Sequence, residues 1–174
     1  IVGRSLALML ASQGLRVALV NLHASTNAGQ GHSDVRAYAL NMAAKQLLTD
    51  LRCWPEDSAC TPILKMHIEG DQGGNLEFSA AEQGVEALNW MVDVPVLEEK
   101  LAQAVHFQTY IEEMSEPVAA PLTVICEGRA SQTRAELGVE FEVKHYAQHA
   151  LACRIKTEAP HHQVAKQWFQ NIQG

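Results

Sequence analysis

The sequence predicts an α/β fold in which a helix-and-strand pattern is interrupted by an antiparallel, strand-rich segment. The chain opens with an amphipathic helix, a glycine and an apolar strand over residues 1–21, and it returns to that pattern at residues 122–137. Between them, residues 61–94 alternate apolar and polar side chains around a glycine-rich turn, as antiparallel hairpins do. One interrupted α/β domain explains this order better than two domains in series.

The opening residues have the pattern of the second half of a strand–glycine turn–helix–strand unit that binds dinucleotides. A helix with one apolar face begins near Gly3, and Gly14 is placed to end it. The apolar run Val17–Val20 is typical of a parallel strand buried on both faces. Gly3 would be the last glycine of a G-x-G-x-x-G turn in a Rossmann-like domain. The earlier glycines would precede Ile1, so we expect the chain to be part of a longer protein.

The elements that follow are assigned from periodicity and turn residues. Residues 22–33 are rich in Ser, Asn, Gly and His, and we interpret them as a loop. A helix is expected over Tyr38–Leu51, where Trp54 and Pro55 would end it. The same reasoning predicts strands over 64–68, 75–78 and 90–94, a helix opened by Pro95, a strand over 122–126, a helix over 130–137, and two strands over 146–155 and 163–169 that pair with each other.

Charge and composition exclude several classes of function. The chain carries 20 acidic and 13 basic residues, a net charge of −7, which argues against a general nucleic-acid binder. It holds neither a run of about 18 apolar residues nor a signal-peptide pattern. The four cysteines are scattered, which fits a reducing cytoplasm. The eight histidines lack zinc spacing, so we expect no metal site.

Candidate ligand-binding residues follow the predicted strands. Asn21 stands at the end of the strand where a dinucleotide-binding unit usually has an acid for the adenosine ribose. Arg36 precedes a helix and can clamp a phosphate or a flavin edge, although a plain surface arginine is the alternative. Glu127 ends the strand at 122–126 and can accept from a ribose hydroxyl, while Gly128 allows the backbone to approach a cofactor. An ordinary strand–turn–helix is the alternative there.

Taken together, these motifs resemble the ubiquinone-biosynthesis hydroxylases, a family of FAD-dependent aromatic monooxygenases. The likeness rests on DVRAYALN at 34–41, LRCW at 51–54, CEGRASQTR at 126–134 and YAQHALACRIKTEAPHHQVAKQWF at 146–169, so it covers essentially the whole chain. The resemblance implies an FAD-binding domain interrupted by a β-rich substrate domain. The implied parts are residues 1–60 and 95–140 for the FAD-binding domain, and 61–94 and 141–174 for the substrate domain.

The resemblance also implies an activity and roles for residues. The parent protein would bind FAD, take hydride from NAD(P)H and use O₂ to hydroxylate the ring of a polyprenylated phenol. Gly3 would be the last fingerprint glycine, Arg36 would lie on the flavin side, Glu127 and Gly128 would touch the cofactor, and Asn21 would replace the usual ribose-binding acid. The cofactor performs the oxygen chemistry, so no catalytic side chain is assigned. The apolar strands near Met66, Ile68, Phe78, Trp90 and Met91 would wall a dry pocket, with ordinary sheet core as the alternative.

Partners and location follow from the implied substrate. A polyprenylated phenol resides in the membrane, so we expect a cytoplasmic protein that visits the inner-membrane surface or a ubiquinone-biosynthesis complex there. Two other readings stay open. The chain is either a truncated, non-catalytic relative that acts as an interaction module, or a simple NAD-dependent oxidoreductase with a Rossmann domain. The hairpin segment at 61–94 argues against the second of these.

Overall fold

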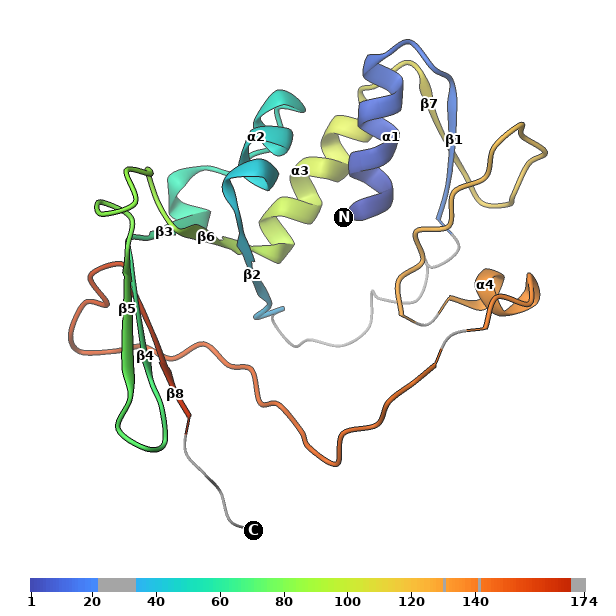
Figure 1. Ribbon diagram of the computed structural model, residues 1–174. Helices are drawn as coiled ribbons and strands as arrows, with labels where there is room; N and C mark the ends of the chain where they lie inside the picture. The colour runs from blue at the N-terminus through green and yellow to red at the C-terminus, as the bar shows by residue number, and fades with distance from the viewer. Residues whose placement is uncertain (22–33, 130, 141, 170–174) are drawn as a thin grey trace. The chain divides into compact units, whose positions relative to one another are not determined.

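A computed structural model describes residues 1–21, 34–129, 131–140 and 142–169 and confirms an α/β protein (Figure 1). The expected loop at 22–33 lies outside these residues. The chain divides into two compact units, of which unit 1 comprises Ile1–Ser33 and Glu98–Ala152, and unit 2 comprises Asp34–Leu97 and Cys153–Gly174. Helix α3 (Val94–His106) begins in unit 2 and continues into unit 1. The domain boundaries expected from the sequence stay a prediction.

Unit 1 contains a parallel pair of strands with helix α1 (Val2–Ser12) beside it. Strand β1 (Val17–Val20) pairs with β7 (Ile111–Met114), from Val17 opposite Ile111 to Val20 opposite Met114. The opening helix and strand are therefore confirmed, and Gly14, at φ +79°, follows the end of the helix. The expectation that β1 is buried on both faces is wrong, because β7 is its single neighbour in the described sheet and its side chains are partly exposed.

Helix α3 supplies the second helix of unit 1. It starts with Val94, and Pro95 occupies its first turn, where a missing N–H has no helical partner to lose. Leu97, Leu101 and Val105 recur every four residues and are fully buried, so one face of α3 forms core. The helix expected from Pro95 is confirmed.

Unit 2 contains a three-stranded antiparallel sheet of β2 (Ala37–Leu40), β6 (Asn89–Asp93) and β3 (Cys60–Ile63), with β6 in the centre. The short helix η1 (Asp57–Ala59) leads into β3. Along β6, Trp90 and Val92 are buried while Met91 between them is exposed, because successive side chains point to opposite faces. The core of the unit also includes Leu48, Cys53, Cys60, Ile63, Ala80 and Ala87.

The helix expected over Tyr38–Leu51 begins too early in the sequence-based assignment. Residues Ala37–Leu40 form strand β2, and helix α2 (Met42–Asp50) starts only after Asn41. The Asn41 side chain accepts a hydrogen bond from the Ala44 N–H at 2.9 Å, which is the geometry of a helix N-cap. The apolar residues before Asn41 pair with β6 instead of extending the helix.

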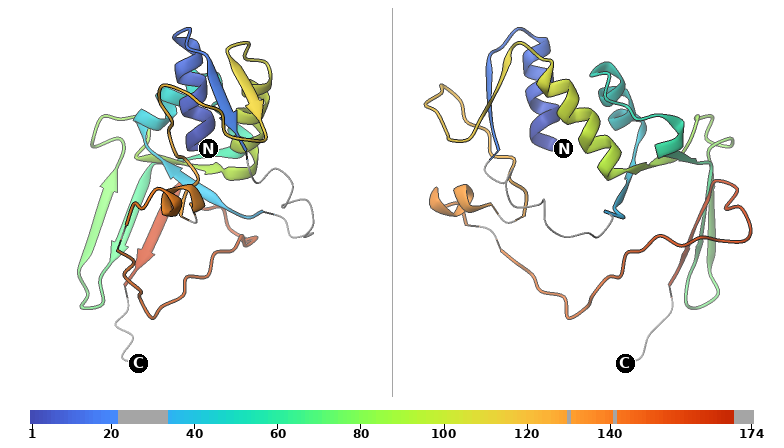
Figure 2. Two further views of the ribbon diagram at one scale, coloured as in Figure 1. Left: turned by 90° about the vertical axis from the view of Figure 1, so that its right-hand side faces the viewer. Right: turned by 180° about the vertical axis from the view of Figure 1, so that it is seen from behind.

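A second sheet of unit 2 joins β4 (Lys65–Glu69), β5 (Asn75–Ser79) and β8 (Val164–Trp168), which lie side by side in both views of Figure 2. Strands β4 and β5 form the antiparallel hairpin expected from the sequence. Strand β8 is also confirmed, but its expected pairing with residues 146–155 is wrong. It pairs in parallel with β4, from Lys65 opposite Val164 to Glu69 opposite Trp168.

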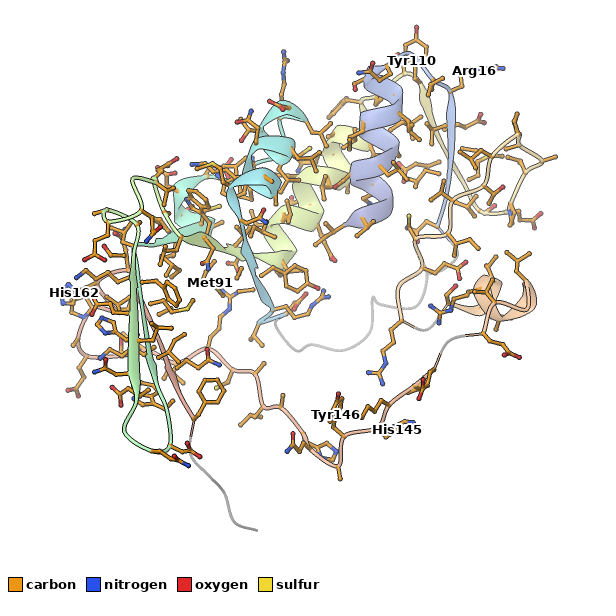
Figure 3. The ribbon with its side chains drawn as sticks, viewed as in Figure 1. Arg16, Met91, Tyr110, His145, Tyr146 and His162 are labelled. Carbon is orange, nitrogen blue, oxygen red and sulfur yellow. The ribbon has the colours of Figure 1, made fainter. Side chains whose placement is uncertain are left out.

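Two expected strands, at 122–126 and 146–155, are not strands in the structure. Leu122 is 77% exposed and Leu151 is 93% exposed. A strand needs a neighbouring ladder for its N–H and C=O groups, and no sheet among the described residues pairs with either segment. Figure 3 shows His145 and Tyr146 on the long stretch that follows α4 (Gln132–Glu136), the helix that lies within the expected range 130–137.

Candidate functional site

The start of helix α1 meets the segment that precedes Glu127. A Cβ atom added at Gly3 would lie 3.2 Å from the Cβ of Cys126, which is tighter than ordinary side-chain contacts. A residue without a side chain therefore lets the two backbones approach at this point. Two of the motifs selected from the sequence thus lie together in unit 1.

The first turn of α1 has backbone N–H groups available for an anion. The N-cap residue is Ile1, whose apolar side chain cannot accept a hydrogen bond. The N–H groups of the first turn have no partner within a helix, and the helix dipole adds partial positive charge there. The first turn carries no acidic side chain that would repel a phosphate.

Glu127 anchors the start of helix α4. One of its carboxylate oxygens, Oε2, accepts from the Ser131 hydroxyl at 2.6 Å and from the Thr133 N–H at 3.2 Å. The other, Oε1, accepts from the Thr133 hydroxyl. Ser131 is the N-cap of α4 and accepts from the Arg134 N–H at 3.1 Å.

Gly128 and Arg134 shape the loop between Glu127 and α4. Gly128 has φ +75°, a conformation that side chains disfavour, and a Cβ there would meet no atom within 4 Å. The Arg134 guanidinium donates to the carbonyls of Gly128 at 3.4 Å and Arg129 at 2.9 Å. The glycine is therefore required by the backbone turn, and the open space above it leaves room for a ligand.

Asn21 lies at the carboxyl end of β1. Its backbone N–H donates to the carbonyl of Met114 at 3.2 Å, which continues the parallel pairing with β7 by one residue. The residue is exposed. Ligands of open α/β sheets gather at the carboxyl ends of strands, and Asn21 lies at such an end, while its expected role at a ribose stays a prediction.

Arg36 belongs to unit 2 and pairs with Asp34. Its Nε lies 2.9 Å from Asp34 Oδ1 and its Nη2 lies 2.6 Å from Oδ2, a two-pronged ion pair. The Arg36 backbone N–H also donates to Asp34 Oδ1 at 3.0 Å. Hydrogen bonds from the Arg36 side chain, followed by the one from its backbone, lower the pKa of Asp34 to about 2. This exposed pair holds the guanidinium in one orientation.

Arg154 is a residue that sequence reasoning did not select. Its guanidinium donates to the carbonyls of Val35 at 3.1 Å and Arg36 at 3.2 Å. It also forms an ion pair with Asp93, with Nη1 lying 3.1 Å from Oδ2 and Nη2 on Oδ1. The sequence feature that could have pointed to Arg154 was its position as the single charged residue within the apolar run 151–155, because a charge in such a run usually has a polar partner.

The expected pocket walls include ordinary core. Trp90 is 4% exposed and packs edge-on against Trp54, with ring centroids 6.1 Å apart. The ammonium of Lys45 lies 4.2 Å from the Trp90 ring centroid and 2.7 Å from Glu86 Oε1. Met91 points to the opposite face of β6 and is exposed (Figure 3). Met66 and Ile68 on β4 pair with Phe78 and Leu76 on β5, which gives that sheet one apolar face.

Five candidate residues are thus divided between the units. Gly3, Asn21, Glu127 and Gly128 belong to unit 1, where Gly3 contacts the residue next to Glu127. Arg36 belongs to unit 2. Whether all five meet around one cofactor therefore stays a prediction. Within the ranges that the structure describes, no three His, Cys, Asp or Glu side chains gather as a metal site would require, and no helix is long and apolar enough to cross a membrane.

The described residues thus form an α/β protein. Helix α1 begins beside Gly3, the polar residue Asn21 follows strand β1, and Glu127 and Gly128 form a turn before α4. No protein-family model matches the chain. It is similar to the 3-demethoxyubiquinol 3-hydroxylase of Escherichia coli strain K12, with 27% identity over 182 residues. That match takes in 90% of this chain and 46% of the relative, so the chain spans less than half the length of the relative it matches.

Among solved structures, the chain is similar to the p-nitrophenol 4-monooxygenase of Pseudomonas putida, with a TM-score of 0.45 and 15% identity. That similarity covers 65% of this chain and 29% of the other, which is too weak to indicate a function. The sequence match, by contrast, supports a likeness to hydroxylases, in agreement with the motifs at 34–41 and 126–134.

Proposed function

We propose that this chain is part of an FAD-dependent hydroxylase that acts on the aromatic ring of a polyprenylated phenol in ubiquinone biosynthesis, with NAD(P)H and O₂ as co-substrates. The observation that carries the proposal is the sequence match to 3-demethoxyubiquinol 3-hydroxylase, because it runs through 90% of the chain. The stretch 34–41 and the turn 126–134 supply the local motifs that agree with it.

The residues of unit 1 fit the adenosine diphosphate part of FAD. The N-terminus of α1 offers N–H donors and partial positive charge to a pyrophosphate. The close approach of Gly3 to Cys126 keeps the acid–glycine turn next to that helix start. Glu127 and Asn21 are the polar side chains for ribose hydroxyls, and Asn21 does this without the charge assistance of an acid.

Arg36 is proposed to hold a phosphate oxygen. Its planar guanidinium matches phosphate as well as carboxylate, and Asp34 already fixes its orientation. The ion pair keeps the local charge close to neutral, so binding an anion there would require the guanidinium to shift away from Asp34.

FAD would supply the oxygen chemistry, and the protein would position it and exclude water. No side chain of this chain is proposed to act as a nucleophile or a general base. The substrate tail is apolar, so we also propose that the parent protein works at the inner-membrane surface from the cytoplasmic side, within or beside a ubiquinone-biosynthesis complex.

The test uses the complete gene product that contains residues 1–174. It is expected to purify with bound flavin, to oxidise NAD(P)H in the presence of O₂ and a polyprenylated phenol, and to release a hydroxylated ring detected by mass spectrometry.

The variant R36M is expected to weaken FAD binding about tenfold, the worth of one charge-assisted hydrogen bond. R16M is the matched control, since Arg16 is an exposed arginine in the turn before β1 (Figure 3). A folded, colourless protein that ignores added FAD would rule the proposal out.

A second candidate is a non-catalytic interaction module. Large apolar side chains between residues 122 and 155 are exposed in the described chain, including Leu122, Leu137, Leu151 and Ile155, and exposed apolar side chains favour contacts with other proteins when they lie together. The same purification distinguishes the two candidates, because a module would co-purify with a partner but without flavin.

The simple NAD-dependent alternative is disfavoured by the antiparallel hairpin β4–β5, which lies between β1 and β7 in the chain.

A further inference from the structure

Arg154 connects three groups that are distant in the sequence. It donates to the carbonyls of Val35 and Arg36, more than a hundred residues earlier, and it pairs with Asp93 at the end of β6. An arginine guanidinium carries its donors in a rigid planar fork, so one side chain fixes several acceptors at once. The contacts therefore hold a local arrangement of backbone and carboxylate.

The three acceptors lie where strand β2 begins. The Arg36 carbonyl also accepts the N–H of Val94 at 3.2 Å, and Ala37 is the register partner of Asp93. The Val94 N–H thus extends the β2–β6 ladder by one step beyond its last residue pair, and Arg154 donates to the same Arg36 carbonyl. Of the residues held in this way, Arg36 forms the ion pair with Asp34, and Val35 lies between the two in the chain.

Charge adds to the effect of geometry. Asp34 and Asp93 both lie beside the Arg36 segment, and two unopposed carboxylates would repel an anionic ligand. Arg154 neutralises Asp93 directly, so its loss changes both the backbone position and the local potential.

We propose that Arg154 is a positioning residue, which fixes the Val35–Arg36 backbone so that the Arg36 guanidinium is presented to a phosphate group of the cofactor. This inference rests on the proposed function. Arg154 itself is not assigned any contact with the cofactor or the substrate.

The test measures FAD affinity by flavin fluorescence in the complete gene product, well below the melting temperature of each variant. R154M is expected to weaken FAD binding about tenfold. R154K keeps the charge but loses the planar fork, and is expected to lie between R154M and the wild type. K156M is the matched control, because it removes a positive charge from the same exposed segment, and its affinity should stay close to the wild type.

The double variant R36M/R154M separates positioning from general stabilisation. If Arg154 acts through Arg36, the double variant binds FAD no more weakly than R36M alone. Additive losses would overturn the inference, and so would wild-type affinity in R154M. If R154M does not fold, R154K and D93N carry the same comparison. A wild-type protein that binds no FAD would defeat the proposed function together with this inference, whereas binding that is insensitive to Arg154 defeats the inference alone.

Discussion

At the scale of single residues, the Asp34–Arg36 pair predicts a specific dependence of stability on pH. The pKa of Asp34 is lowered from 3.8 to about 2, chiefly by the Arg36 hydrogen bonds. A carboxylate whose pKa is lower in the folded state than in the unfolded state stabilises the fold at pH values above its unfolded-state pKa. That stabilisation is lost as the pH falls through its folded-state pKa. The difference in unfolding free energy between the wild type and D34N should therefore be constant at neutral pH and shrink as the pH falls from 3.8 towards 2.

Urea unfolding of both proteins over that pH range measures the difference directly. D71N is the matched control, because Asp71 lies in the exposed turn between β4 and β5. A difference between the wild type and D34N that is unchanged down to the lowest pH would show that the pair does not exist in solution.

Glu127 gives the second prediction at this scale. Its carboxylate accepts from Ser131, which is only 7% exposed, so removing the acceptor leaves a buried hydroxyl with a lost partner. We expect E127A to destabilise the protein by about 1 to 2 kcal/mol. Thermal unfolding of E127A and of E140A, which removes an exposed carboxylate from the same region, provides the measurement. Equal melting temperatures would mean that Glu127 does not hold the start of α4.

At the scale of elements, the boundary between β2 and α2 depends on Asn41. Its side chain accepts the Ala44 N–H, which otherwise lacks a partner in the first turn of the helix. N41A should lower the unfolding free energy by about 1 kcal/mol, and N41D should keep most of it, because aspartate also caps helices. Q46A tests the specificity of the effect, since Gln46 lies on the same helix in an exposed position. A loss in Q46A as large as in N41A would contradict the capping role.

The same boundary shows how far local sequence determines an element. The helix-forming pattern continues backward through Ala37–Leu40, so periodicity alone extends the helix to Tyr38. Pairing of those residues with β6 decides the question, and this partner lies about fifty residues away in the chain. Strand β7 escaped prediction for a related reason. Its centre is Glu112-Glu113, which has low strand propensity, and its parallel pairing with β1 supplies the stability that composition does not.

The segments 122–126 and 146–155 show the opposite case, because a composition that favours strands finds no neighbouring strand to pair with among the residues that the structure describes. Residues 122–126 are apolar and β-branched, which suits a buried strand, but a strand exists only when a neighbouring ladder accepts its backbone. In the described chain this segment contributes a contact with Gly3 instead. The glycines and the acid–glycine turn could be selected from sequence because backbone conformation restricts the residue type. Arg154 could not, because its role arises from residues brought together only by folding.

At the scale of the whole molecule, the last prediction concerns catalysis by residues 1–174 alone. A flavin hydroxylase must keep water away from the reacting oxygen, so its site has to be enclosed. Here large apolar side chains such as Leu122, Leu151 and Ile155 are exposed to solvent, and the described parallel sheet has only two strands. We therefore expect the 174-residue chain to show no flavin-dependent NAD(P)H oxidation, even with excess FAD and a phenolic substrate.

Absorbance at the nicotinamide band, followed with and without FAD, provides the measurement. The complete gene product serves as the matched comparison, and it should oxidise NAD(P)H under the same conditions. If the 174-residue chain alone sustains turnover, an enclosed flavin site must form from these residues, and the exposure of Leu122 and Leu151 cannot describe the working state. If neither protein turns over and neither binds FAD, the interaction-module reading becomes the better account, because the exposed apolar segment would then be the main functional feature of the chain.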